Sequence, residues 1–485
     1  MNVAFDPWIP VMTMSGESQL ASLYTIFTEG EGLADLAVRP HERVALMRLF
    51  ICVAHAALNG PQNYDEWCKV PERLREAASE YLKAWKDSFE LFHPTKPWLQ
   101  VASLKPSKEN DEDSLTSVNK LDFSLASSLF NHFQDTKEIV FTESQLAIGL
   151  LTIQNFSTCG LISQPIWEGT LTAKSAKDAP CIASSMYHVF LLADNLYTTI
   201  CENICDFNEL TFLYNNKKDL WLGRPVWEYE SIKKANDSLT QTFLGRLVPL
   251  SRAVLLKKGS SRMLYGEGLR YKSFPEYTQE FNTSVTIRIV KKKEVRVLVG
   301  AKTWSRPWRQ LDAILQYNQQ DRTISQHAIP LNHLSGKPID IWVGALLRNP
   351  GKQDILDTVE SRFHIPEQLR SANGCATYAH EVEESEKIFN KLDKAIYFYK
   401  SLLDPVGNTS IGSSALSYYW TSVENNLLLL MAYINAIDTD NAVQKKETWH
   451  KMLFKSACEA YQLVCNKDTP RQMMAFLKGW HWLTS

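Results

Sequence analysis

The stretch that follows residue 371 restricts the fold of this chain more than any other. Apolar residues at helical spacing predict helices over about 377–402, 411–436, 440–466 and 470–483. The last of these begins at Asp468-Thr469-Pro470, which supplies a cap residue and a proline for the first helical turn. Because helices joined by short connections pack as antiparallel neighbours, the pattern predicts a four-helix bundle over residues 373–485.

The chain before the bundle mixes helical and extended patterns. Dense apolar runs predict helices over 42–58, from near residue 71 to a point before His93-Pro94, over 144–154 and over 184–203. A chain of 485 residues exceeds the ~250–300 residues at which single cores stop growing. We therefore expect an α+β protein in which a large mixed domain, residues 1–372, precedes the bundle.

Composition narrows the classes of protein to be considered. The chain is 45% hydrophobic and 11% aromatic, which is ample material for a core. No apolar run reaches the ~18 residues of a membrane span, and the opening residues lack the features of a signal peptide. The 9 cysteines are scattered and odd in number, which favours reduced thiols. We expect a cytoplasmic protein with no membrane partner.

Charge is unevenly distributed along the chain. Residues 246–309 contain fifteen Lys and Arg but only four Glu, a net charge of +11, which leaves −13 for the rest because the total is −2. Such a separation favours phosphate contact while limiting nonspecific binding. Within this segment, residues 285–290 and 295–299 alternate around Lys291-Lys292-Lys293-Glu294, which predicts a hairpin with a basic tip. The alternative is a solvated sheet edge protected by lysines.

A polar tip interrupts the apolar stretch between residues 339 and 359. Residues 348–353 read Arg-Asn-Pro-Gly-Lys-Gln, and Asp354 is a candidate cap for a helix that continues through Ile355, Leu356 and Val359. Amides, a lysine and a bare glycine backbone are groups that probe base edges or separate a base step. An ordinary surface turn explains the same Pro-Gly signal.

Known catalytic patterns are missing from the sequence. There is no phosphate-binding loop, no GxGxxG after a strand, no GxSxG and no zinc-helix motif. Cys201 and Cys205 share a helix face, but no second ligand pair follows, so we interpret them as buried small hydrophobes. We expect no catalytic residues, no cofactor and no metal.

Several short stretches, collinear along the chain, resemble a known family. They are Asp6-Pro7-Trp8-Ile9-Pro10-Val11, Lys96-Pro97-Trp98-Leu99-Gln100, Leu129-Phe130-Asn131, a lysine-bearing segment before the hairpin, the turn near Gly351 and the closing bundle. Together they resemble CasA, the large subunit of the type I-E CRISPR surveillance complex called Cascade. The opening motif is the most specific of the six, and the resemblance spans essentially the whole chain.

The resemblance implies a non-enzymatic subunit that reads the protospacer-adjacent motif (PAM) of duplex DNA from the minor groove and starts unwinding. Three DNA-contacting elements are implied. A lysine finger corresponds to Lys272, with Arg270 as the competing residue. A wedge corresponds to residues 349–353. A glycine loop corresponds to Gly169, the single glycine of Glu168-Gly169-Thr170-Leu171, followed by Lys174.

Within the wedge, Asn349 begins the turn, Gly351 allows close backbone approach, and Lys352 and Gln353 compete for the inserted position. Phe130 and Asn131 are implied to anchor the subunit at the guide-RNA end of the complex, although simple loop packing also explains them. The implied partners are double-stranded target DNA, guide RNA, the other Cascade subunits and a helicase-nuclease. Some relatives carry a cysteine cluster, but residues 206–374 contain no cysteine, so no zinc is expected.

A function of another class remains open at this level. A metal-dependent nucleic-acid-processing enzyme could assemble its site from dispersed residues that no motif reveals.

Overall fold

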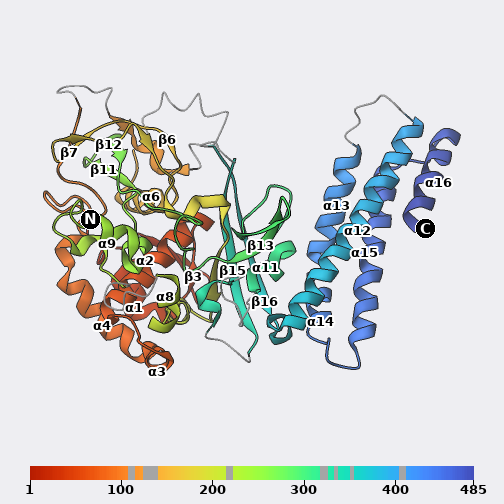
Figure 1. Ribbon diagram of the computed structural model, residues 1–485, viewed down its shortest axis with the longest axis horizontal. Helices are drawn as coiled ribbons and strands as arrows, with labels where there is room; N and C mark the ends of the chain where they lie inside the picture. Colours follow the sequence, from red (N-terminus) through yellow and green to blue (C-terminus); the bar gives the residue numbers. More distant parts are fainter. Residues whose placement is uncertain are drawn as a thin grey trace. The chain divides into compact units, whose positions relative to one another are not determined.

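The computed structural model describes residues 1–107, 115–123, 140–214, 222–316, 326–332, 337–349, 354–403 and 411–485. The chain folds into two compact units (Figure 1). The first unit contains Met1–Leu334 and Asp340–Phe363, and the second contains Ser335–Ile339 and His364–Ser485. The domain division predicted at residue 372 stays a prediction. No helix of the described residues is long and apolar enough to cross a membrane.

Helix α2 (Pro40–Leu58) forms the centre of the first unit, and its side chains are buried from Pro40 to His55. This explains its dense apolar run, and the helix ends where Asn59 adopts a left-handed φ of 56°. Helices α4, α6 and α10 pack against it. The helices of this unit are α1 (Leu23–Glu29), α3 (Tyr64–Cys68), α4 (Val70–Ala84), α6 (Glu143–Phe156), α7 (Leu196–Glu202), α8 (Phe207–Leu213), α9 (Asn236–Gln241), α10 (Phe243–Leu247) and α11 (Leu311–Leu315).

Small antiparallel sheets accompany these helices. They have the strand orders β2-β1-β3, β10-β15-β16, β11-β12-β5, β13-β14, β4-β7-β8 and β6-β9. The strand bounds are β1 Ile9–Thr13, β2 Ser18–Ala21, β3 Leu33–Leu36, β4 Leu104–Lys105, β5 Thr116–Ser117, β6 Gly160–Leu161, β7 Ile166–Trp167, β8 Thr170–Leu171, β9 Ser175–Ala176, β10 His188–Leu192, β11 Arg252–Leu256, β12 Arg262–Glu267, β13 Val285–Val290, β14 Lys293–Leu298, β15 Ile339–Arg348 and β16 Ile355–Ile365.

The predicted hairpin over the basic segment is confirmed as β13 and β14, which pair from Val285↔Leu298 to Val290↔Lys293. Lys291 and Lys292 form its turn with positive φ values of 51° and 65°. Positive φ at both central residues is the conformation that matches the twist of two short strands. The hairpin thus presents lysines at positions where Asn-Gly is usually preferred.

Two predicted helices are wrong. Residues 184–203 contain strand β10 and then α7, because the short apolar run His188–Leu192 pairs with β15 and is buried on both faces. Asp354 caps no helix, since its backbone oxygen accepts a hydrogen bond from the Asn349 amide at 3.0 Å and the chain continues as β16. Spacing alone does not separate a short buried strand from a helix.

The second unit is helical, as predicted, and the α+β class is confirmed. Its helices are α12 (Ala372–Leu403), α13 (Ile411–Asn425), α14 (Leu427–Ile434), α15 (Ala442–Val464) and α16 (Pro470–Thr484). The single helix predicted over 411–436 is two helices that meet at Asn426, whose side chain donates to the Ser422 oxygen at 2.8 Å. Helix α12 packs against α13, α15 and α16. As the sequence predicted, Thr469 caps α16 and Pro470 occupies its first turn.

Candidate nucleic-acid interface

Glu267, at the end of β12, is a buried carboxylate that joins two basic loops. Its side chain is 4% exposed and accepts the Lys177 amide at 3.1 Å and the Arg270 Nε at 3.2 Å. Arg252 Nη1 lies 3.5 Å from the other carboxylate oxygen. Burial raises the pKa of Glu267, while these cationic and amide neighbours oppose that rise. The loop around Lys177 and the loop that carries Arg270 are therefore held by one group.

The two candidates for the finger differ in their surroundings. The Arg270 guanidinium is occupied, because it binds Glu267 and donates to the Ser175 oxygen at 3.3 Å. Lys272 is exposed, and its ammonium has no recorded hydrogen bond or ion pair within the part of the chain that the structure describes. Between them, the buried Tyr271 accepts the Leu250 amide on its hydroxyl at 2.9 Å. Of the two cations, Lys272 is the one whose charge faces solvent unpaired.

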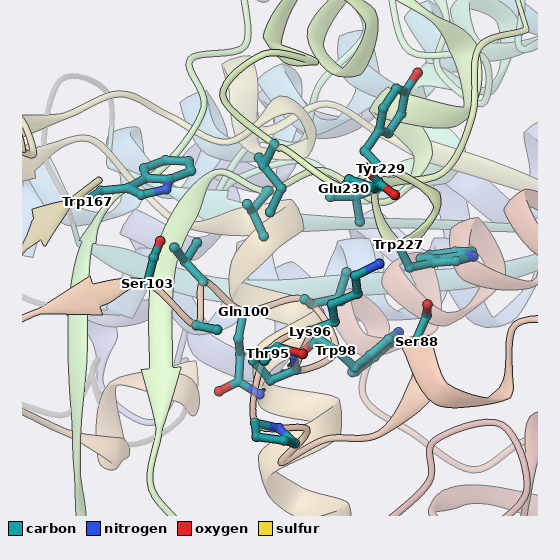
Figure 2. A pocket seen from close by; sticks show the side chains of 18 of the residues that line it. Ser88, Thr95, Lys96, Trp98, Gln100, Ser103, Trp167, Trp227, Tyr229 and Glu230 are labelled. Carbon is teal, nitrogen blue, oxygen red and sulfur yellow. Dashed lines mark hydrogen bonds between the residues drawn. The ribbon is translucent and has the colours of Figure 1, made fainter. Parts of the chain in front are cut away.

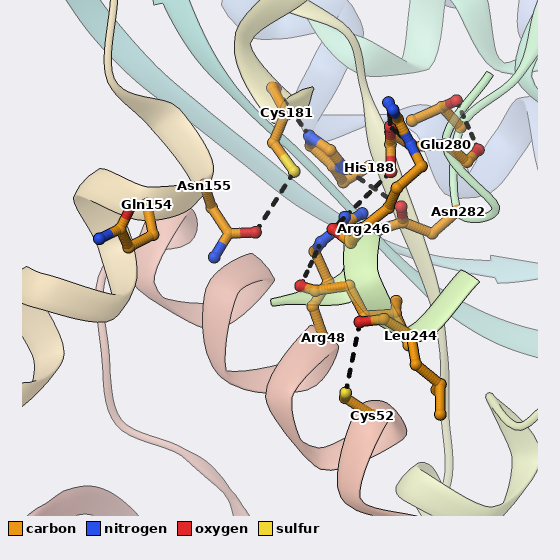
Figure 3. Close-up of polar contacts among 12 residues, drawn as sticks. Arg48, Cys52, Gln154, Asn155, Cys181, His188, Leu244, Arg246, Glu280 and Asn282 are labelled. Atoms are coloured by element: carbon orange, nitrogen blue, oxygen red, sulfur yellow. Dashed lines mark hydrogen bonds and ion pairs between the residues drawn. The ribbon is translucent and has the colours of Figure 1, made fainter. Parts of the chain in front are cut away.

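A buried ion network of Arg48, Arg246 and Glu280 (Figure 3) holds the backbone of Lys272 through one hydrogen bond. Glu280 lies 2.9 Å from Arg48 Nη2 and 2.5 Å from Arg246 Nη2, and all three side chains are almost fully buried. Burial alone would raise the pKa of Glu280, but the two guanidinium groups outweigh it and lower that pKa. Arg246 also donates to the Lys272 oxygen at 3.1 Å. The exposed lysine is thus attached to the core through Arg246.

Gly169 occupies an exposed turn between β7 and β8. Glu168 and Gly169 both have positive φ, 47° and 78°. A Cβ on Gly169 would meet no atom within 4 Å, so the backbone conformation, rather than crowding, favours glycine there. Lys174 is exposed a few residues further on, and its oxygen accepts the Ile162 amide at 3.0 Å.

Trp167 and Glu168, which lead into this turn, help to line a cavity of about 440 Å³ (Figure 2). Aromatic side chains line it, together with Lys96, Glu168 and Glu230; the aromatic residues are Trp98, Trp167, Trp227 and Tyr229. Gln100, from the second stretch of the family resemblance, is buried and accepts the Leu256 amide at 2.7 Å. That stretch therefore acts in packing. Across the described ranges, no group of three or more His, Cys, Asp and Glu is arranged to hold a metal ion.

The base of the predicted wedge is tied to the same region. Arg348, the last residue of β15, lies 2.6 Å from the Asp178 carboxylate, which also accepts the Cys159 amide at 2.7 Å. Asn349 directly follows β15, and its amide donates to the oxygen of Asp354, which directly precedes β16, at 3.0 Å. Gly351, Lys352 and Gln353 lie outside the described residues, as do Phe130 and Asn131 of the predicted anchor.

The structure thus links the segment 158–178, the loop 267–272 and the end of β15 through Glu267 and Asp178. Neither acid belongs to a motif that the sequence reveals. The sequence does contain a signal for Glu267, because the basic segment has only four acidic residues. Glu267 and Glu280 are two of them. The same contacts reduce the surface charge of that segment, since Arg246 and Arg252 are buried and paired with these acids.

The fold and this surface define a two-unit α+β protein whose surface loops are tied together by buried acids. A family model described as CRISPR-associated protein Cse1 matches residues 2–460, and the chain belongs to this family. The predicted resemblance to CasA is confirmed at that level. CRISPR-associated protein CasA/Cse1 of Thermus thermophilus is 28% identical over 239 residues, which are 48% of this chain and 43% of that relative. The match thus spans less than half of the relative's length.

Solved structures support the fold over the entire chain. Thermus thermophilus CasA superposes with a TM-score of 0.77 at 20% identity, covering 100% of this chain and 98% of that one. Thermobifida fusca Cse1 gives a TM-score of 0.76 at 17% identity, with 100% and 97% covered. A chain of a structure described as a CRISPR RNA-guided surveillance complex gives 0.73 at 16% identity, with 100% and 99% covered.

Proposed function

We propose that this protein is a non-catalytic subunit of Cascade, an RNA-guided antiviral complex. In this proposal it recognises the PAM of double-stranded DNA from the minor groove, wedges the duplex open to start R-loop formation and helps to recruit a helicase-nuclease. Guide RNA and the other Cascade subunits are its partners. A relative of this fold in a surveillance complex supports the assembly. The observation that carries the DNA-reading role is the connection of three loop elements through Glu267 and Asp178.

The chemistry of the minor groove suits these elements. That groove displays a degenerate pattern of acceptors, so a reader there tolerates several sequences. The backbone of Lys272 is held by Arg246, whereas its ammonium group is unpaired among the described residues. The ammonium group can therefore contact acceptors or phosphates without first breaking an ion pair. Gly169 supplies an exposed backbone without a side chain, which allows close approach. The exposed Lys174 adds positive charge beside it.

The energetics require a wedge that is held firmly. Unstacking one base step costs a few kcal/mol, and groove contacts must offset this cost. The strand exchange that follows is nearly balanced, so a local wedge together with phosphate contacts decides whether it starts. We place the inserted group at Gln353 or Lys352, beyond Asn349 and with Gly351 giving the backbone room. Phe130 and Asn131 are proposed to contact the guide end of the complex.

The proposal is tested with the assembled complex and target duplexes with and without PAM. We expect Lys272→Ala and one of Gln353→Ala and Lys352→Ala to reduce the preference for the PAM-containing duplex. We expect Arg270→Ala to act less, because Arg270 is paired with Glu267. Lys445→Ala, at an exposed position of α15, is the control. Unchanged PAM preference in all of the finger and wedge variants would remove the proposal.

The alternative, a metal-dependent nucleic-acid-processing enzyme, has its own test. The isolated protein is incubated with DNA and Mg²⁺, with and without a chelator. Cleavage that the chelator abolishes would establish that alternative, and we expect intact DNA.

A further inference from the structure

Trp304 exposes its indole ring near the end of the basic segment, residues 246–309. Its side chain is 64% exposed, and the only other tryptophan of comparable exposure among the described residues is Trp482 at 41%. A ring of this size contributes favourable free energy when another molecule covers it.

The local backbone holds Trp304 at the apex of a tight turn. The Ser305 amide donates to the Lys302 oxygen at 3.3 Å, which closes the turn around Thr303 and Trp304. Pro307 and Trp308, which follow directly, are buried and start a 3₁₀ helix, Pro307–Gln310. The second tryptophan of the motif Trp304-Ser305-Arg306-Pro307-Trp308 thus anchors the turn, while the first faces solvent.

Two cations lie over the exposed ring. Lys302 Nζ is 4.5 Å from the ring centroid and the guanidinium carbon of Arg309 is 5.4 Å from it. Arg309 also donates to the Trp304 oxygen at 3.2 Å. These contacts orient the ring, and 64% of the side chain remains exposed beside the two cations.

We propose that Trp304, with Lys302 and Arg309, is a stacking platform for single-stranded DNA. An unpaired base stacks on the open ring, and the two cations neutralise the adjacent phosphates. A paired base is already stacked on its neighbours and gains little from the ring, so the platform favours a single strand over a duplex. The choice of DNA rests on the proposed function, because opening a target duplex releases one unpaired DNA strand.

The test uses the full chain and two labelled strands of equal length. One is oligothymidine, and the other has the same phosphodiester backbone with abasic sites. We expect the wild type to bind oligothymidine more tightly. We expect Trp304→Ala to weaken that binding roughly tenfold, which is the size of one base stack, and to leave abasic binding nearly unchanged. Trp304→Phe should retain most of the preference.

Trp482→Ala, on α16, is the matched control and should change neither affinity. Trp304 is at the surface, so its variants should melt with the wild type. Equal binding of both strands by the wild type would mean phosphate contact alone and would overturn the proposal. Unchanged oligothymidine affinity in Trp304→Ala would also overturn the proposal. This holds as well if that variant fails to join the complex.

The outcome is separable from that of the proposed function. In the assembled complex, we expect Trp304→Ala to keep its preference for PAM-containing duplex while the opened strand becomes more reactive to permanganate. Loss of PAM preference in the finger and wedge variants tests the reading role, whereas the oligothymidine comparison tests the platform without any PAM.

Discussion

Arg348 Nη1 lies 2.6 Å from the Asp178 carboxylate, which pairs the end of strand β15 with the segment that also carries Lys174 and Lys177. The pair is largely shielded from solvent, with 13% and 28% of the two side chains exposed. Screening by water is therefore weaker than for a surface ion pair. In the proposed function, this contact holds the wedge turn in register with the glycine turn.

Removing this ion pair should uncouple the wedge from its support. We expect Asp178→Asn or Arg348→Ala to lower the free energy of unfolding by about 1–3 kcal/mol, between the effects of breaking an exposed and a fully buried ion pair. The affinity for PAM-containing duplex should fall by more than the loss of folding stability explains. Chemical unfolding and duplex titration measure the two effects, and the double variant should lose little more than either single one. Additive losses would contradict a direct pairing.

Gly169→Ala tests the glycine turn against a matched position. Gly169 has φ of +78° and Gly16 has φ of +85°, and a Cβ at either would meet no atom within 4 Å. Both alanine variants should therefore cost about 1–2 kcal/mol of stability through the backbone alone. Only Gly169→Ala should weaken binding of the assembled complex to PAM-containing duplex. Equal DNA binding by the two variants would remove Gly169 from the interface.

Glu280→Gln should destabilise the first unit strongly. The change leaves Arg48 and Arg246 buried without their shared counter-charge, and breaking a buried pair in this way costs about 3–5 kcal/mol. Glu276→Gln, at an exposed glutamate of the same segment, is the control and should change stability little. Denaturant unfolding measures both. A loss below about 1 kcal/mol for Glu280→Gln would show that the network is dispensable.

Acidification should destabilise the fold through buried histidines. Burial lowers the pKa of His188 and of His41 to about 4, and that of His55 to about 3. Unfolded histidine has a pKa of about 6.5, so the unfolded chain binds more protons as pH falls below that value. Stability should thus be full above pH 6.5 and decline toward pH 4, by up to about 1.4 kcal/mol per pH unit for each histidine.

Melting curves between pH 6.5 and 5 check this expectation. Glu267 has the opposite effect on the pH dependence of stability, because burial raises its pKa. Its effect is present in both the wild type and a histidine variant. The difference between their melting curves therefore reports that histidine alone. The slope for His188→Gln should be shallower than that of the wild type. Parallel curves would mean that His188 is not held neutral in the fold.

Local signals predicted the helices well where caps and periodicity agree. The run over 42–58 ends at Asn59, and α16 begins at Thr469 and Pro470, as their side-chain chemistry requires. The signals failed where pairing with a distant strand decides the conformation. Strand β10 forms because β15 lies beside it, and β15 comes far later in the chain.

The candidate site was predictable only in part. The family resemblance placed the finger at Lys272 with Arg270 as the competing residue, and the contact between Arg270 and Glu267 distinguishes the two side chains. Asp178 was missed because its partner, Arg348, is distant in sequence. The net charge of a segment does not reveal that Arg246 and Arg252 are buried, because a charge count treats every cation as if it faced water.

The sheet β10-β15-β16 has a consequence for how the chain folds during synthesis. Strand β10 pairs with β15 from His188↔Gly344 to Leu192↔Asp340, and the Phe190 and Trp342 rings lie 6.1 Å apart. A nascent chain that has reached only Leu334 contains most of the first unit but leaves β10 as an open edge, which invites pairing with other chains. Folding of the first unit on the ribosome must therefore wait for β15, and ribosome stalling before residue 339 should yield an aggregation-prone intermediate.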